Sequence, residues 1–311
     1  MIVEQQRDSS SRSFLAGPTD ARPIPPYTIA VGDSDYMAYR SNWYETPIID
    51  GIFLAAKRLR HNIIMLSGYP GAEMGSNIPA CARLATGLIH MHSRINDETY
   101  EAIRNSRWPV VTIGGRPSES SVTSIDIDNV AAARQATRHL IELGHRRIAY
   151  LAVQSGDPNS MLDGTSGLRE MGYRLAHEDA SLPVDESLIS FGWATMQSGA
   201  ERGGKLAVMP PDQRPTAAFC FNDGIALGLI RVVAGFGIRI PEDLSVVGFD
   251  DIVEAGMARP ALTTIRQPLR QIGERAVDLL VDTIEGRTLP GHEETVPHEL
   301  IVRQSTSRTA S

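Results

Sequence analysis

The chain has 311 residues, of which 42% are apolar and 22% are charged, and it carries a net charge of −7. This length suffices for two domains of ordinary size, and the acidic balance argues against a free-standing nucleic-acid-binding protein, which needs clustered Lys and Arg. No apolar run reaches the roughly 18 residues of a membrane span, and the polar N-terminus lacks the apolar centre of a secretory signal. The sequence therefore predicts a cytoplasmic protein without a membrane segment.

The first segment, residues 1–26, is rich in Ser, Arg, Asp and Pro and ends in the run Pro-Ile-Pro-Pro. This composition predicts a disordered tail or linker. The segment is also too short and too poor in apolar residues to form a folded DNA-binding headpiece.

From Tyr27 onward, short β-branched runs alternate with longer stretches of helical spacing. The predicted strands are 28–32, 62–66, 87–91, 109–113, 122–127, 148–153, 216–221 and 244–249. The predicted helices are 48–59, 131–143, 167–177, 197–208 and 224–234. Strands that alternate with helices of this length indicate βαβ units and parallel sheets covered on both faces. Since the pattern occurs twice, it predicts an α/β fold with two similar lobes.

Polar side chains follow several of these strands. Asp33 and Asp35 follow the first, Asp128 follows 122–127, Asn222 follows 216–221, and Asp250 follows 244–249. Ligands of open parallel α/β sheets bind outside the carboxyl ends of the strands. Carboxylates and amides aligned there suit a polyhydroxyl ligand, because each can form paired hydrogen bonds to hydroxyl groups. The alternative for each residue is a helix N-cap, a position that Asp and Asn also favour.

No catalytic or metal-binding motif is complete. Residues 199–205 match the first seven positions of a phosphate-binding loop, but Leu206 cannot supply the hydroxyl that ligates magnesium. The pair His90 and His92 has no accompanying Cys, His or carboxylates at metal-binding spacing. No nucleophile with a neighbouring base is evident. The sequence therefore predicts a protein that is not an enzyme and needs no metal or cofactor.

A series of motifs carries a family resemblance over residues 27–306. The motifs are TRHLIELGHRRIAYL at 137–151, REMGY at 169–173, PTAAFCFNDGIALG at 215–228, IPEDLSVVGFDD at 240–251, PALTTIRQP at 260–268 and LIVRQST at 300–306. In order and spacing the chain resembles the effector-binding core of the lactose/galactose-repressor (LacI/GalR) family of bacterial transcription regulators.

The resemblance implies two Rossmann-like lobes, each a parallel sheet flanked by helices, joined by three crossovers as in type I periplasmic binding proteins. The N-terminal lobe would comprise residues 27–144 and 269–296. The C-terminal lobe would comprise residues 145–268 and 297–305, followed by a tail at 306–311. The ligand would bind between the lobes.

The resemblance also implies ligand contacts. These are Arg169, as a rigid hydrogen-bonding fork, Trp193, as a face for a pyranose or a flat base, and Asn222, Asp250, Asp128 and Gln267. Asp33, Asp35 and Tyr36 are added from the first lobe, where the segment 33–46 is longer than the loop usual in the family. The alternatives are a surface ion pair of Arg169 with Glu170 or Glu178, and a half-buried core position for Trp193.

Ligand-dependent transcription regulation is therefore the leading functional hypothesis, with a sugar or related polyol as effector and a nucleoside as the alternative. Family members pair lobe against lobe, which implies a homodimer. They contact DNA through an N-terminal helix-turn-helix, for which this sequence shows no pattern, so it does not support DNA binding by the chain itself. A solute-binding protein of a transport system is the second hypothesis, and an enzyme that uses this fold is the third. The sequence leaves open whether the effector activates or releases the output.

Overall fold

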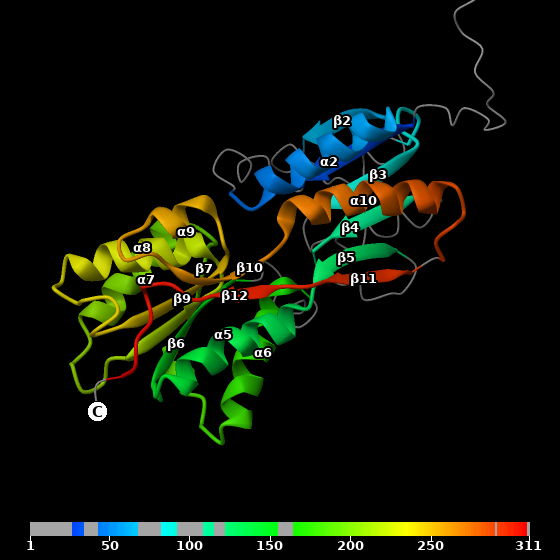
Figure 1. Ribbon diagram of the computed structural model, residues 1–311. Coiled ribbons are helices and arrows are strands. Elements are labelled where there is room, and N and C mark those ends of the chain that lie inside the picture. Colours follow the sequence, from blue (N-terminus) through cyan, green and yellow to red (C-terminus); the bar gives the residue numbers. More distant parts are fainter. Residues whose placement is uncertain are drawn as a thin grey trace, which may run out of the picture.

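The computed structural model describes seven ranges of the chain: 27–33, 43–67, 82–91, 108–114, 122–154, 164–289 and 291–309. The predicted tail 1–26 lies outside these ranges. The described chain forms two lobes, each built on one six-stranded sheet (Figure 1). No helix within the described ranges is both long and apolar enough to cross a bilayer.

The first sheet has the strand order β11-β5-β4-β3-β1-β2, and all of its pairings are parallel. Its strands are β1 (Thr28–Asp33), β2 (Asn62–Ser67), β3 (Gly87–Met91), β4 (Val110–Ile113), β5 (Thr123–Ile127) and β11 (Glu293–Val296). The second sheet has the order β12-β10-β9-β8-β6-β7. Its strands are β6 (Ile148–Val153), β7 (Ile189–Gly192), β8 (Ala217–Cys220), β9 (Ser245–Asp250), β10 (Thr263–Arg266) and β12 (Glu299–Ile301).

The two sheets share one topology. Each places its second strand at one edge and then runs first, third, fourth and fifth strand, followed by one strand contributed from the C-terminal part of the chain. In the second sheet only β12, paired with β10, is antiparallel among the described pairings. Since this doubly wound order binds ligands beside the first strand, at the carboxyl ends, the topology predicts where each lobe faces its ligand. The two-lobed α/β fold expected from the sequence is thus confirmed.

Helices α2 (Glu45–Leu59) and α10 (Leu269–Ile284) cover one face of the first sheet, and Figure 1 shows them side by side. They approach closely because each has a glycine at the crossing. A Cβ on Gly51 would lie 2.0 Å from the carbonyl oxygen of Arg270, and one on Gly273 would lie 2.0 Å from that of Ile48. Both contacts are shorter than packed atoms tolerate, so glycine is required at this crossing.

The second sheet is covered on both faces. Helices α5 (Asn129–Glu142) and α6 (Thr165–Asp179) pack on one face, where Tyr150, Phe219 and Phe249 join the core shared with the first lobe. The neighbouring strand residues point to the other face, where α7 (Met196–Ala207), α8 (Asp223–Ala234) and the short α9 (Val253–Met257) form a separate apolar core. The alternation of side chains along each buried strand explains this division.

The chain crosses between the lobes three times: from β5 to α5, from β10 to α10, and from β11 to β12. The first crossing differs from the expectation. The sequence places the boundary at residue 144, but α5 packs on α6 and on strands of the second sheet, so the chain leaves the first lobe near Asp128. Gly144 ends a helix, as predicted, but a helix end is not a lobe boundary, because the sheet against which the helix packs decides its lobe.

The end of the described chain is attached to the second lobe. The backbone N–H of Ser307 donates to the hydroxyl of Ser245, and that of Thr309 donates to the carbonyl of Leu143. The ring of His145 also bonds the carbonyl oxygen of Ser307. Residues 306–309 of the expected tail are therefore held by hydrogen bonds, and residues 310–311 lie outside the described part of the chain.

Candidate functional site

A cavity of about 250 Å³ lies where the two lobes meet at the carboxyl ends of their strands. From the first lobe it receives the two residues that precede α2, Trp43 and Tyr44. From the second lobe it receives the first turns of α7 and α8 and the segment after β9. Its lining in the described chain is Trp43, Tyr44, Ala194, Thr195, Met196, Gln197, Asn222, Gly224, Asp250 and Ile252.

Arg169 lies beside this cavity on the first turns of α6 and is 3% exposed. Its guanidinium carbon lies 3.5 Å from the centre of the Phe249 ring and 4.3 Å from that of Phe221. Its Nε donates to Asn129 Oδ1 at 2.9 Å, and its Nη1 donates to the carbonyl of Phe221 at 2.5 Å. These contacts hold the plane of the guanidinium and leave Nη2 directed to Asp250.

Asp250 ends β9 and lines the cavity with a backbone φ of 110°. Its Oδ1 accepts a 2.7 Å hydrogen bond from Gln267 Nε2 and lies 3.8 Å from Arg169 Nη2. Burial raises the pKa of this carboxyl to about 6, against the opposing effects of Arg169 and Gln267. Three predicted ligand contacts, Arg169, Asp250 and Gln267, are therefore brought together by the fold.

Gln267 is 4% exposed, and its Oε1 has no hydrogen-bond partner in the described chain. It directly follows β10, one residue before the second crossing between the lobes. A buried amide oxygen without a partner costs free energy, so this atom is a ready acceptor for a ligand hydroxyl or for water.

Asn222 has two roles. Its Oδ1 accepts from the backbone N–H of Ile225 at 2.9 Å, which makes it the N-cap of α8, as the alternative interpretation held. Its Nδ2 donates to the carbonyl of Ala194, and the residue also lines the cavity. The following Asp223 is fully buried and accepts from Thr264 Oγ1 and Ile252 N. Burial and the nearby Asp250 raise its pKa well above the ordinary value.

Asp128 and Asn129, at the start of α5, make different contacts. Asp128 is exposed and caps the helix by accepting from Ala131 N at 2.9 Å. Asn129 is 2% exposed and donates to Asp126 Oδ2 while it accepts from Arg169 Nε. Asn129 therefore links the first lobe to the Arg169 cluster, whereas the ligand contact expected of Asp128 stays a prediction.

The remaining predicted contacts lie away from this cluster or outside the description. Trp193 is 75% exposed and is not among the described residues that line the cavity, so its contact with a ligand stays a prediction. Asp33 ends β1, at the expected sheet edge. Asp35 and Tyr36 lie outside the described residues.

Of the described residues that line the cavity, the sequence identified only Asn222 and Asp250, and it also missed Asn129. Trp43 and Tyr44 lie near the end of the segment 33–46, which is longer than the loop usual in the family. The sequence analysis chose the exposed Asp128 as the ligand contact instead of the buried Asn129. Burial and the carboxylates of Asp126 and Asp250 raise the pKa of Tyr44, so its phenol stays protonated. The signal that could have found Trp43 and Tyr44 is a pair of aromatic residues just before a helix at a strand-to-helix connection.

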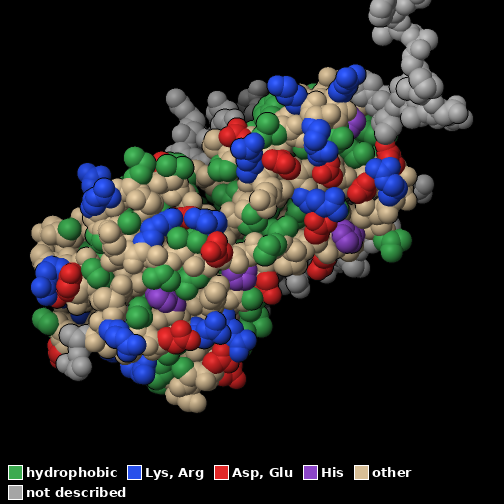
Figure 2. Space-filling view, in the orientation of Figure 1, with side chains coloured by type: hydrophobic (Ala, Val, Ile, Leu, Met, Phe, Trp, Pro, Cys, Tyr) green, Lys and Arg blue, Asp and Glu red, His purple; other side chains and the backbone are tan. Residues whose placement is uncertain are grey.

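Opposite charges are paired at the site and interspersed on the surface (Figure 2). Inside, Asp250 faces Arg169, so the two charges compensate each other. Outside, Figure 2 shows basic and acidic side chains interspersed over the described part of the viewed face. Within the described ranges, no group of three His, Cys, Asp or Glu side chains is arranged to hold a metal ion.

Two doubly wound lobes with a cavity between their strand ends define a two-lobed ligand-binding protein. The comparison with family models agrees: residues 137–306 match the periplasmic binding protein-like domain. The chain belongs to the LacI family of transcriptional regulators.

The similar proteins support this membership. The transcriptional regulator CelR of Thermobifida fusca is 32% identical over 283 residues, which are 89% of this chain and 80% of CelR. Catabolite control protein A of Priestia megaterium is 31% identical over 86% of this chain and 79% of its own. Among solved structures, a CelR–cellobiose complex has a TM-score of 0.80 at 31% identity, covering 91% of this chain and 86% of that one. A LacI-family regulator of Enterococcus faecium with bound ribose has a TM-score of 0.77 at 25% identity, covering 91% and 100%.

Proposed function

We propose that this chain senses a small neutral sugar in the cavity between its lobes and transmits its binding as lobe closure to a transcriptional output. The observation that carries the proposal is the convergence of Arg169, Asp250 and Gln267 beside a cavity that both lobes line. A carboxylate, an amide and a guanidinium held in fixed positions suit paired sugar hydroxyls. The relatives crystallised with cellobiose and with ribose lend support, and the match to regulators favours this role over transport or catalysis.

Closure follows from the placement of the groups. Trp43 and Tyr44 approach from the first lobe, whereas Asn222 and Asp250 approach from the second. A ligand that touches both sets gains all of its contacts only when the lobes are close together. It can shift the equilibrium only by the difference between its affinities for closed and open lobes.

The test is thermal unfolding of the purified chain with D-ribose, D-xylose, D-glucose, cellobiose and adenosine at millimolar concentration. A ligand present at 100 times its Kd adds about 2.7 kcal/mol to the free energy of unfolding, a shift that is easily measured. We expect one of the sugars to stabilise the chain and Arg169→Ala to abolish the shift.

The matched control is Arg174→Ala, on the same helix. Arg174 pairs with Glu170 and Glu186 at the surface, so its removal should leave the sugar-induced shift unchanged. The absence of a shift with every sugar would contradict the proposal, and a shift with adenosine alone would assign the site to nucleosides.

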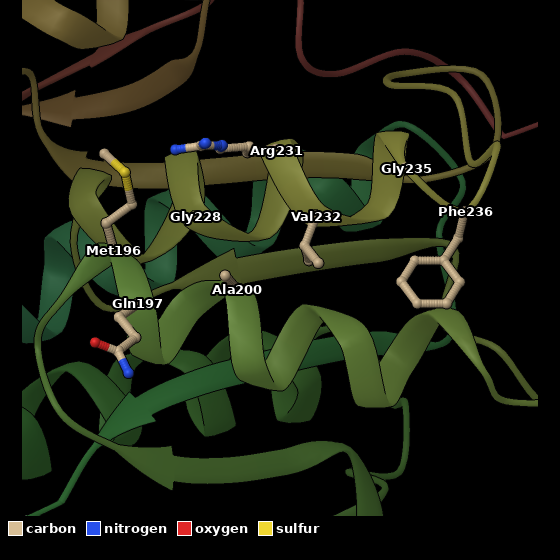
Figure 3. Close-up of a pocket in the computed structure, with 8 residues that line it drawn as sticks. All are labelled: Met196, Gln197, Ala200, Gly228, Arg231, Val232, Gly235 and Phe236. Atoms are coloured by element: carbon tan, nitrogen blue, oxygen red, sulfur yellow. The ribbon is translucent and has the colours of Figure 1, made fainter.

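A homodimer is the second part of the proposal. A groove of about 570 Å³ runs between α7 and α8 on the outer face of the second lobe. Figure 3 shows Met196 and Gln197 at one end of it, Val232 along α8, and Phe236 beyond the end of α8. Phe236 is 53% exposed. Exposed apolar surface is typical of interfaces, and we propose that a second copy of the chain covers this groove, because dimers transmit closure in this family.

The dimer is tested by analytical ultracentrifugation. Phe236→Asp places a charge in the groove, so we expect it to convert dimers to monomers. Met171→Asp, on α6 behind the opposite face of the second sheet, is the control and should remain dimeric, because Met171 is equally exposed (52%) but lies outside the groove. A monomeric unaltered chain, or dimers that survive Phe236→Asp, would refute the assignment.

A further inference from the structure

Trp43 of the first lobe packs on the second lobe. It stands just before α2, yet it is packed against the apolar core formed by strands and helices of the second lobe, including Ile225 and Ile252. A Cβ placed on Gly224, the second residue of α8, would lie 3.2 Å from Cζ3 and 3.7 Å from Cε3 of the indole. The indole therefore rests directly on the backbone of α8.

Gly224 has no other described reason to be glycine. Its φ is not in the left-handed region that favours glycine, and glycine near a helix start gives up the better helix propensity of alanine. The nearest atom that an added Cβ would meet belongs to the indole of Trp43. The indole of Trp43 therefore occupies the space that a side chain at position 224 would take, and we call this space the seat of Trp43.

This seat also bounds the ligand cavity, because both Trp43 and Gly224 line it. With the seat filled, the cavity measures about 250 Å³, below the roughly 300–1,000 Å³ typical of sites for drug-sized ligands. We propose that Trp43, seated on Gly224, is a size gate that restricts the ligand to a monosaccharide. The inference rests on the proposed sugar site between the lobes and adds the class of sugar.

The seat is tested first without any ligand, by acrylamide quenching of tryptophan fluorescence. The signal of Trp43 is the difference between each protein and its Trp43→Phe counterpart, so that the signals of Trp108 and Trp193 cancel. We expect Gly224→Leu to raise the quenching constant of Trp43 about twofold or more, because the leucine occupies the seat. Gly204→Leu, on α7, is the matched control, since a Cβ there meets nothing within 4 Å. Unchanged quenching in Gly224→Leu would overturn the seat.

The gate is tested by titration calorimetry with D-ribose, D-xylose, D-glucose and cellobiose. The unaltered chain should bind one of the monosaccharides more tightly than cellobiose. In Trp43→Ala the ratio of cellobiose affinity to monosaccharide affinity should rise roughly tenfold, because the monosaccharide loses one aromatic contact and the cavity gains the space of the indole. Trp43→Phe should give an intermediate ratio.

The outcomes separate this inference from the proposed function. Tighter binding of cellobiose by the unaltered chain, or an unchanged ratio in Trp43→Ala, would overturn the gate while leaving the sugar sensor intact. If no sugar binds any of the proteins, the sensor proposal and the gate both fail, whereas the quenching experiment still decides whether Trp43 is seated on Gly224.

Discussion

The replacement Asp250→Asn tests the electrostatics of the site through protein stability. Asp250 lies buried beside the cavity, where the loss of hydration disfavours its charge more than Arg169 and Gln267 favour it, and its pKa is raised from 3.8 to about 6. Asparagine has the same shape, can still accept from Gln267, and tolerates a positive φ better than most residues. The change therefore removes the buried carboxylate charge, while Arg169 keeps Asn129 and the carbonyl of Phe221 as hydrogen-bond partners.

The sign of the effect follows from proton binding. Between pH 3.8 and about 6, folded Asp250 holds a proton that the unfolded chain has released. The folded state thus binds more protons in this window, and the free energy of unfolding falls as the pH rises through it. The two pKa values differ by about 2, which at 1.36 kcal/mol per pKa unit corresponds to about 3 kcal/mol above pH 6. We expect Asp250→Asn to raise the free energy of unfolding by about 1–3 kcal/mol at pH 7.5 and to leave it unchanged near pH 4.

The assay is urea unfolding at several pH values from 4 to 7.5, with Asp251→Asn for contrast. Asp251 accepts from Arg266 Nε at 2.7 Å and from Arg303 Nη2 at 2.6 Å. Its neutralisation should lower the free energy of unfolding by roughly 1–3 kcal/mol at pH 7.5. If Asp250→Asn destabilised the protein at pH 7.5 as Asp251→Asn does, Asp250 would be a stabilising carboxylate, and the reasoning would be refuted.

Two further substitutions test the packing of the second lobe by thermal or urea unfolding. Gly228→Ala should lower the free energy of unfolding by about 1–3 kcal/mol, because the added Cβ would lie 2.0 Å from the carbonyl oxygen of Met196. Gly204→Ala, where the added Cβ meets open space, should raise it by up to about 1 kcal/mol. Equal effects of the two substitutions would show that α7 and α8 do not pack as described. Tyr150→Phe should be neutral or stabilise by about 1 kcal/mol, since the buried hydroxyl of Tyr150 has no hydrogen-bond partner in the described chain; a clear loss would reveal a partner.

The sequence predicts the repeating fold well because the pattern is local. Strands 87–91 and 148–153 have the predicted bounds, and 28–32 and 62–66 differ from the structure by one residue. The lobe of α5 could not be read in this way. The apolar face of α5 fits either sheet, and only its packing on α6 and on strands β8, β10 and β12 in the folded chain decides which.

The site was partly predictable for a similar reason. Asp250 and Asn222 end parallel strands or begin the helices that follow them, so the topology alone brings them to one edge. The position of the Arg169 guanidinium over the rings of Phe221 and Phe249 required the tertiary structure. The contact of Trp43 with Gly224 also required the tertiary structure, because residues about 180 positions apart in the sequence give no local signal of contact.

Amide hydrogen exchange of the purified chain with and without its best sugar tests the central claim most directly, namely that one ligand joins the two lobes. Slower exchange is expected at the same sugar concentration in residues 43–49 of the first lobe and in residues 222–226 and 250–252 of the second. Protection confined to one lobe, or located away from these segments, would contradict a ligand site between the lobes.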